Sequence, residues 1–150
     1  MPLAQKCSEI ASYIEGLLET NKVSLQLADV WFGDQQLLPH TPSACVIVGA
    51  TEFTSAGSPR RVQADFEVQV LIYHCKLQDQ QVTELECSQR AEATAALLNA
   101  IITGHGILVG SFVTKIEPGF VDKNNGQTWY KTSRVTFSGF SLFNLPLGEV

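Results

Sequence analysis

Residues 62–73 alternate apolar and polar side chains over twelve positions, and this pattern places the tightest constraint on the fold. The side chains of a β-strand point to its two faces in turn, so a period of two predicts one long strand with one face toward a core. The polar face is left for water or for a partner. The apolar members are Val62, Ala64, Phe66, Val68, Val70 and Ile72, and the polar members are Gln63, Asp65, Glu67 and Gln69.

An amphipathic helix is predicted on each side of this strand, at about 3–20 and at about 79–102. In both segments the apolar residues recur at spacings of three and four, which is the repeat of one helix face. We expect the two helices to cover the apolar face of the strand. The first stripe is Leu3, Cys7, Ile10, Ile14 and Leu17, and the second is Leu85, Ser88, Ala91, Ala95, Leu98 and Ile102.

Three further strands are predicted at 43–53, 107–117 and 128–143. Because strands follow one another instead of alternating strictly with helices, the chain is expected to be an α+β sandwich. Its two helices would pack on one face of a mixed, mostly antiparallel sheet of about four main strands. At 150 residues, we expect a single domain over 1–150.

The connections predict two hairpins. Residues 54–61 are rich in Ser, Gly and Pro and should form a flexible arm that projects from the hairpin of 43–53 and 62–73. Residues 118–127 are interpreted as a turn region that joins the last two strands. In the last strand the apolar residues change face after Ser138 and Gly139, which suggests a bulge or bend there.

Trp31 and Phe32 are adjacent in a segment that we expect to be short and extended. Neighbours in an extended chain point in opposite directions, so one of the two aromatic rings should face outward. That ring would either close the edge of the core or contact another subunit.

The charge balance limits the possible partners. The net charge is −5, and only Arg60 and Arg61 form an adjacent basic pair, so general binding to nucleic acid is not expected. No apolar run approaches the roughly 18 residues of a membrane span. We therefore expect no membrane partner.

The residues that could carry chemistry lack the usual spacing. The four cysteines are widely separated and are expected to be reduced, and only His74 and Cys75 bring two metal-ligand types together. Asp65 and Glu67 share one strand face and could serve as an acid and base pair, although a solvated sheet face has the same pattern. We expect no metal, no cofactor, no catalytic residues and no enzymatic activity.

The order and character of the elements resemble those of the tail terminator or neck proteins of tailed bacteriophages. The resemblance rests on the first helix, the Ala-rich second helix and three sequence stretches. These are Pro39-His40-Thr41-Pro42-Ser43-Ala44-Cys45-Val46, Val70-Leu71-Ile72-Tyr73 and Tyr130-Lys131-Thr132-Ser133-Arg134-Val135-Thr136-Phe137.

The resemblance implies a structural virion protein that forms a ring, typically a hexamer, on the last ring of the tail tube. The ring would stop tube polymerisation and join the tail to head-completion proteins, and DNA would pass through without specific binding. Such a protein is assembled in the host cytoplasm and resides in the tail or neck of the virion.

Two groups of residues are candidates for contacts in that ring. The polar strand face, Gln63, Asp65, Glu67 and Gln69, would line the channel or contact a neighbour. The candidate interface residues lie in the arm, near the first short strand and in the apolar tail: Thr54, Ser55, Arg60, Arg61, Trp31, Phe140, Phe143, Leu145 and Leu147.

Two alternatives remain. The chain could be a small-ligand-binding or enzymatic α+β domain with its pocket between sheet and helices. It could also be a neighbouring neck protein or the tail-tube subunit itself.

Overall fold

The computed structural model describes residues 3–35, 38–58, 61–77, 83–100, 110–123, 126 and 128–144, with the backbone alone at 3–8, 50–51, 55–58, 61–62, 110–112 and 141–144. Two helices and five strands are formed in this part of the chain. In order they are α1 (Leu3–Thr20), β1 (Asp29–Phe32), β2 (Ser43–Ser58), β3 (Arg61–Lys76), α2 (Glu84–Ala100), β4 (Gly110–Lys123) and β5 (Thr128–Asn144).

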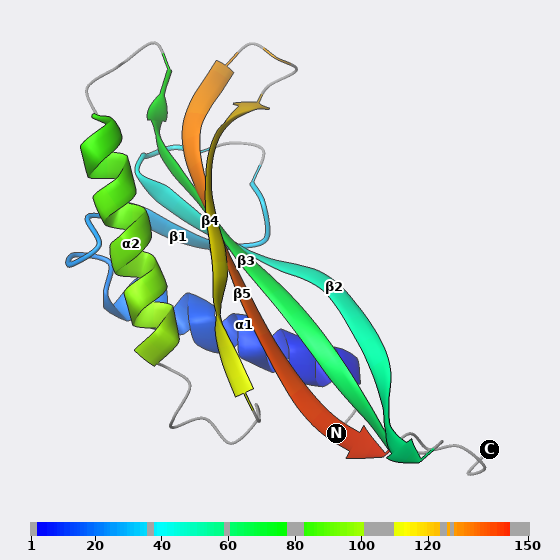
Figure 1. The fold of residues 1–150 in the computed structure, drawn as a ribbon. Helices are drawn as coiled ribbons and strands as arrows, with labels where there is room; N and C mark the ends of the chain where they lie inside the picture. The colour runs from blue at the N-terminus through cyan, green and yellow to red at the C-terminus, as the bar shows by residue number, and fades with distance from the viewer. Residues whose placement is uncertain are drawn as a thin grey trace.

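The strands form one sheet in the order β1-β2-β3-β5-β4 (Figure 1). β1 is parallel to β2, and all the other neighbours are antiparallel. The prediction of a mixed, mostly antiparallel sheet is therefore confirmed. The described part of the chain has five strands where about four main strands were expected. The additional strand is β1, the short extended segment that contains Trp31 and Phe32.

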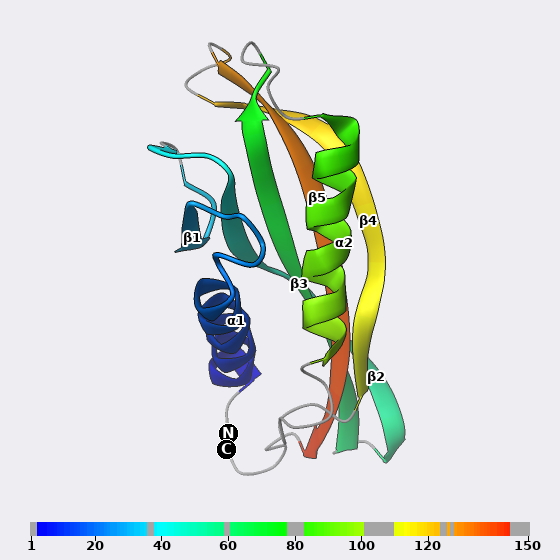
Figure 2. The same ribbon diagram turned by 90° about the vertical axis from the view of Figure 1, so that its left-hand side faces the viewer.

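Both helices cover the same face of the sheet, as predicted (Figure 2). α1 lies against β1 and β2, and α2 lies against β4 and β5. We call this face the helix side and the opposite face the open face. The residues of the predicted apolar face of 62–73 whose side chains are described all join the core on the helix side: Ala64, Phe66, Val68, Val70 and Ile72.

Helix α1 has the predicted bounds, and the buried face of α2 contains Ala91, Ala95 and Leu98 as predicted but not the first two residues of the predicted stripe. Thr83 caps the N-terminus of α2, because its Oγ1 accepts a hydrogen bond from the backbone N–H of Glu86 at 3.2 Å. Leu85 is 66% exposed and Ser88 is exposed, so the prediction that they face the core was wrong. The buried residues are Cys87, Arg90, Ala91, Thr94, Ala95 and Leu98.

The first hairpin is a paired ribbon rather than two strands joined by a flexible loop. β2 continues to Ser58 and pairs there with Arg61, so the prediction of a polar loop over 54–61 was wrong. Ser and Gly have weak β propensity, but here their backbone pairs with β3, which is held by β5 on its other side up to Asn144. Residues 59 and 60 lie outside the description.

The predicted turn at 118–127 begins too early. β4 continues through Pro118 and ends at Lys123. Proline has no N–H to donate, but β4 is the outermost strand, where one side of the backbone needs no partner strand.

The predicted bulge at Ser138 and Gly139 is absent from the pairing of β3 with β5, which is continuous there. Gly139 lies opposite Phe66 on the helix side, and Phe140 lies opposite Asp65 on the open face. The change of apolar parity therefore reflects two different faces of a regular strand.

Candidate assembly surface

The open face carries the four polar residues of β3 that were predicted to face water or a partner. Gln63, Asp65, Glu67 and Gln69 are all half-buried. Gln63 donates a hydrogen bond to Asp65 at 2.9 Å, and Arg134 of β5 donates one to Gln69 at 2.8 Å. Neighbouring side chains on this face thus hold one another in place.

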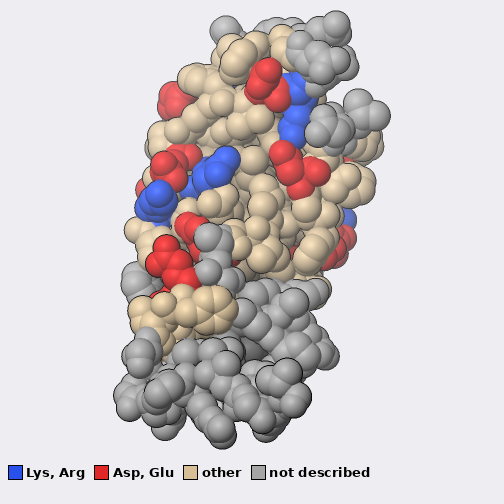
Figure 3. All heavy atoms as spheres, turned by 90° about the vertical axis from the view of Figure 1, so that its right-hand side faces the viewer, with Lys and Arg blue, Asp and Glu red and all other residues tan. Residues whose placement is uncertain are grey.

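Basic side chains from β4 and β5 balance the acidic residues on this face. Arg134 comes from β5, and on β4 Lys115 lies 3.3 Å from Glu117. Figure 3 shows acidic and basic side chains interspersed over the described part of the open face. The face is therefore mixed in charge, and not acidic as the sequence of β3 alone suggested.

One end of the open face is covered by a second, smaller core. Leu71 and Tyr73 are buried there with Cys45, Leu38 and Tyr130. Asp34, in the segment that follows β1, accepts hydrogen bonds from the Tyr73 hydroxyl at 2.7 Å and from the Lys123 ammonium at 2.8 Å. The segment after β1 is therefore tied across the sheet to the end of β4.

Among the described residues of the strands, the exposed large apolar side chains lie toward the two opposite edges of the sheet. On the first two strands they are Phe32, Val48 and Phe53, which we call the β1 edge. On the last two strands they are Ile116, Phe120 and Trp129, which we call the β4 edge. Among the described side chains, none of this class lies on β3, the central strand.

All six of these side chains lie on the helix side. Paired residues in a sheet share a face. Phe32 pairs with Val46, Val48 with Val68 and Phe53 with Ala64, and the partners belong to the core under the helices. Ile116 pairs with the core residue Val135. Phe120 lies four residues farther along β4, and Trp129 pairs with Asp122 two residues beyond that, so both share the face of Ile116.

A cavity of about 220 Å³ opens beside the β4 edge. It lies between α2 and the strands β4 and β5, on the helix side. Lys131 in its wall is held by Glu84 at 2.8 Å. The lining comprises Glu84, Cys87, Ser88, Pro118, Gly119, Phe120, Lys131, Thr132 and Ser133.

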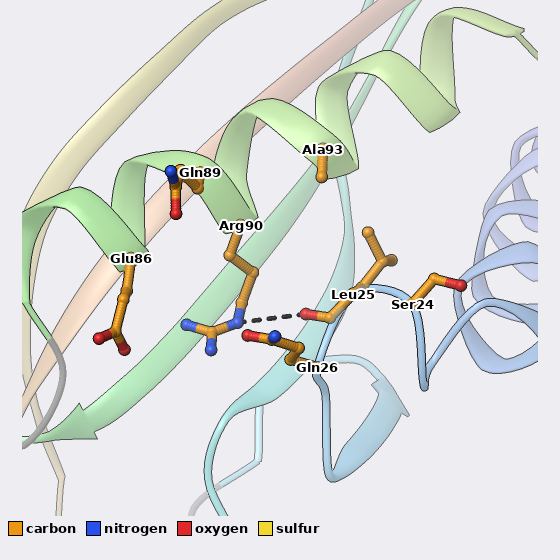
Figure 4. Close-up of a pocket in the computed structure, with 7 residues that line it drawn as sticks. All are labelled: Ser24, Leu25, Gln26, Glu86, Gln89, Arg90 and Ala93. Carbon is orange, nitrogen blue, oxygen red and sulfur yellow. Dashed lines mark hydrogen bonds between the residues drawn. The ribbon is translucent and has the colours of Figure 1, made fainter.

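A second cavity, of about 170 Å³, lies between α2 and the turn after α1 (Figure 4). Arg90 lines it, is only 7% exposed and donates from Nε to the carbonyl oxygen of Leu25 at 3.2 Å. Its Nη1 also lies 2.7 Å from Nδ1 of His74. No carboxylate in the described part of the chain lies within ion-pair distance of Arg90.

The contact with Arg90 fixes the tautomer of His74. A guanidinium can only donate, so Nδ1 of His74 accepts, and Nε2 carries the proton that is donated to Ser133 Oγ at 2.8 Å. Burial, and then the positive charge of Arg90, lower the pKa of His74 to about 4. The ring is therefore neutral at physiological pH and serves as a hydrogen-bonded core residue.

The predicted interface residues fall into three groups. Thr54 is exposed on the ribbon, while Trp31 and Phe140 are half-buried. Trp31 packs against the smaller core, so Phe32 is the ring that faces outward. The side chains of Ser55, Arg61 and Phe143 lie outside the description, as do Arg60, Leu145 and Leu147 altogether.

Sequence reasoning missed the β4 edge. Ile116, Pro118 and Phe120 alternate with Glu117 and Gly119, and this period of two is the signal of a strand. That signal was lost because Pro118 and Gly119 were interpreted as a turn. Extending the strand through an edge proline would have placed Ile116 and Phe120 on one face.

The structure describes the side chains of most residues that were considered for metal binding or catalysis. Cys45, Cys75 and Cys87 are free and buried, and burial raises the pKa of the Cys45 thiol to about 11. Asp65 and Glu67 lie on the open face, on the other side of the sheet from both cavities. In the described ranges, no three His, Cys, Asp or Glu residues gather around a common point, and no helix is long and apolar enough to cross a membrane.

No protein-family model and no curated protein matches the chain. Among the solved structures that match, one whose name describes no activity is 20% identical to the chain, and the match covers 92% of this chain and 96% of that one, with a TM-score of 0.39. A likeness at that level carries no argument about function.

Proposed function

We propose that this chain is a structural virion protein whose copies close into a ring at the end of a bacteriophage tail tube. The ring stops tube polymerisation and joins the tail to head-completion proteins, and the chain catalyses no reaction. The observation that supports the ring is the presence of two apolar edges. The place in the phage tail rests on the sequence resemblance.

The two apolar edges carry the argument because they are different surfaces on opposite sides of one molecule. A two-fold dimer needs one self-complementary patch, whereas a ring needs two unlike patches that meet head to tail. Phe32 and Phe53 on one side, and Phe120 and Trp129 on the other, are each about half exposed. Contact between unlike edges would bury both patches in every copy.

In such a ring the open face is free for the channel or for the tube. Its mixed charges and half-buried polar side chains offer no basic surface to hold phosphates. DNA could therefore pass through without specific binding. The paired end of β2 at 54–58 replaces the flexible arm as the candidate contact with a neighbouring protein.

The ring is tested by measuring the mass of the purified protein over a range of concentrations, with negative-stain images of the same samples. We expect one discrete oligomer with a central hole. Phe120→Asp places a charge on the β4 edge and should shift the protein to monomer, whereas Ser12→Asp on the exposed side of α1 should not. A protein that stays monomeric both alone and with tail-tube protein of the same phage would contradict the proposal.

The ligand-binding alternative has one observation in its favour, the cavity beside Arg90. A buried guanidinium without a carboxylate partner in the described part of the chain could attract a small anion. Glu86 also lines this cavity and would repel that anion. Thermal stabilisation by inorganic phosphate that is lost in Gln89→Ala would favour this alternative over a purely structural protein.

A further inference from the structure

We propose that the side chain of Phe32 of one copy occupies the cavity between α2 and β4 of the next copy. This inference rests on the proposed ring and specifies its contact. Phe32 is the last residue of β1 and is 45% exposed. The chain turns away at Gly33, whose φ is +83° and whose N–H is bonded to the carbonyl of Val46.

The cavity has the size and the walls for an aromatic ring. A dry cavity of roughly 150 Å³ is large enough to bind benzene, and this one measures about 220 Å³. Pro118 and Phe120 provide apolar walls, and Phe120 can meet a second ring edge to face. The Lys131 ammonium, held by Glu84, provides a cation that an aromatic face attracts.

The two features lie on the same side of the sheet. Phe32 is on the helix side of β1, and the cavity is on the helix side of β4. When copies join edge to edge around a ring axis, the helix side of one copy continues as the helix side of the next. A side chain at the β1 edge can therefore reach a cavity at the β4 edge without turning a subunit over.

The strand registers also place Phe32 and the cavity at similar positions along the strand direction. One row of paired residues crosses the whole sheet from Phe32 to Ile116, through Val46, Val70 and Val135. Pro118, at the near side of the cavity, is two residues farther along β4, or about 7 Å. The reach of a phenylalanine side chain and a modest tilt between copies cover that offset.

Phe53 fits the cavity less well, although it is 51% exposed at the same edge. Its row passes through Ala64 to Ser141, whereas β4 begins at Gly110, opposite Phe140. Copies joined at the same height would leave Phe53 beyond the start of the neighbouring β4. Phe32 is therefore the side chain of this edge that we assign to the cavity.

The test uses two full-length variants, each of which alters one half of the contact. Phe32→Asp removes the aromatic ring and keeps the cavity, and Ser88→Trp fills the cavity and keeps Phe32. We expect each variant alone to need at least ten times the wild-type concentration to assemble. An equimolar mixture should form one-to-one complexes and nothing larger, because only one of the two possible contacts is intact.

Ser12→Asp, on the exposed side of α1, should retain assembly near the wild-type concentration. Circular dichroism of each variant separates loss of contact from loss of fold, and Phe32→Ser serves as a second variant should Phe32→Asp fail to fold. As an independent readout in a Cys87→Ser background, Phe32→Cys combined with Ser88→Cys should give a reducible ladder of covalent oligomers under an added thiol oxidant, which neither single cysteine variant gives.

The outcomes separate this inference from the proposed function. A wild-type ring that survives both Phe32 substitutions unchanged would overturn the contact and leave the ring intact. A mixture of Phe32→Asp and Ser88→Trp that stays monomeric would overturn it as well. A wild-type protein that forms no ring would overturn the proposed function itself.

Discussion

Arg90 and His74 form a buried polar pair whose charge state depends on the fold. Arg90 reaches the turn after α1 and the central strand together, through Leu25 and His74. A second positive charge next to the guanidinium would be strongly unfavourable in this buried place, so His74 must stay neutral. The pair therefore links α2 to the turn after α1 and to β3 only when the imidazole is unprotonated.

Stability should fall below neutral pH because of His74. Its pKa is about 4 in the folded chain against 6.5 for an ordinary histidine, so the unfolded state binds the proton first. The contribution of His74 is complete above pH 6.5 and is lost as the pH falls toward 4. Between pH 7 and pH 5 the free energy of unfolding should drop by about 2 kcal/mol from this group.

Urea denaturation at the two pH values and one protein concentration measures this drop. In His74→Gln the amide oxygen can still accept from Arg90 without titrating, so the drop should shrink by that amount. His40→Gln, at an exposed position, should behave as the wild type. An unchanged pH dependence in His74→Gln would contradict the assignment.

At the scale of elements, two glycines lie in very different surroundings. A Cβ at Gly16, inside α1, would have open space around it to 4 Å, whereas a Cβ at Gly49 would lie 3.1 Å from the backbone oxygen of Glu67. Gly49 lies at the irregularity between Val48 and Thr51, where β2 passes close to β3. The same substitution should therefore have opposite effects at the two sites.

Gly16→Ala should raise the free energy of unfolding by about 0.5–1 kcal/mol, since alanine loses less backbone entropy in a helix. Gly49→Ala should lower it by about 1–3 kcal/mol, because the β2 backbone must shift away from Glu67. Thermal or urea unfolding of the two variants side by side checks both. Equal effects at the two sites would contradict the close contact between the backbones of β2 and β3 at Gly49.

At the scale of the whole molecule, the sheet separates its edges from its open face. The apolar contacts proposed for the ring lie at the edges on the helix side, and Asp65 and Glu67 lie on the open face near the centre. Asp65→Asn with Glu67→Gln should therefore leave the oligomer mass unchanged, while Phe120→Asp disrupts it. Loss of the ring in the open-face variant would show that this face is itself a subunit contact.

Much of the local structure follows from the sequence because period and composition act over short distances. The alternation in β3, the bounds of α1 and the placing of both helices on one face were predicted correctly. Hydrophobic spacing alone determines which side of an isolated strand or helix seeks a core. The outward ring at the end of β1 was also expected, although the sequence did not distinguish Trp31 from Phe32.

The tertiary structure decided what depends on partners far apart in the chain. Pairing with β3 made a strand of 54–58, and the edge position let β4 run through Pro118. Arg90 is buried on α2 with His74 and Leu25 as partners, and no local pattern encodes those contacts. The two apolar edges exist only once the order β1-β2-β3-β5-β4 is set, because sheet order is fixed by long-range pairing.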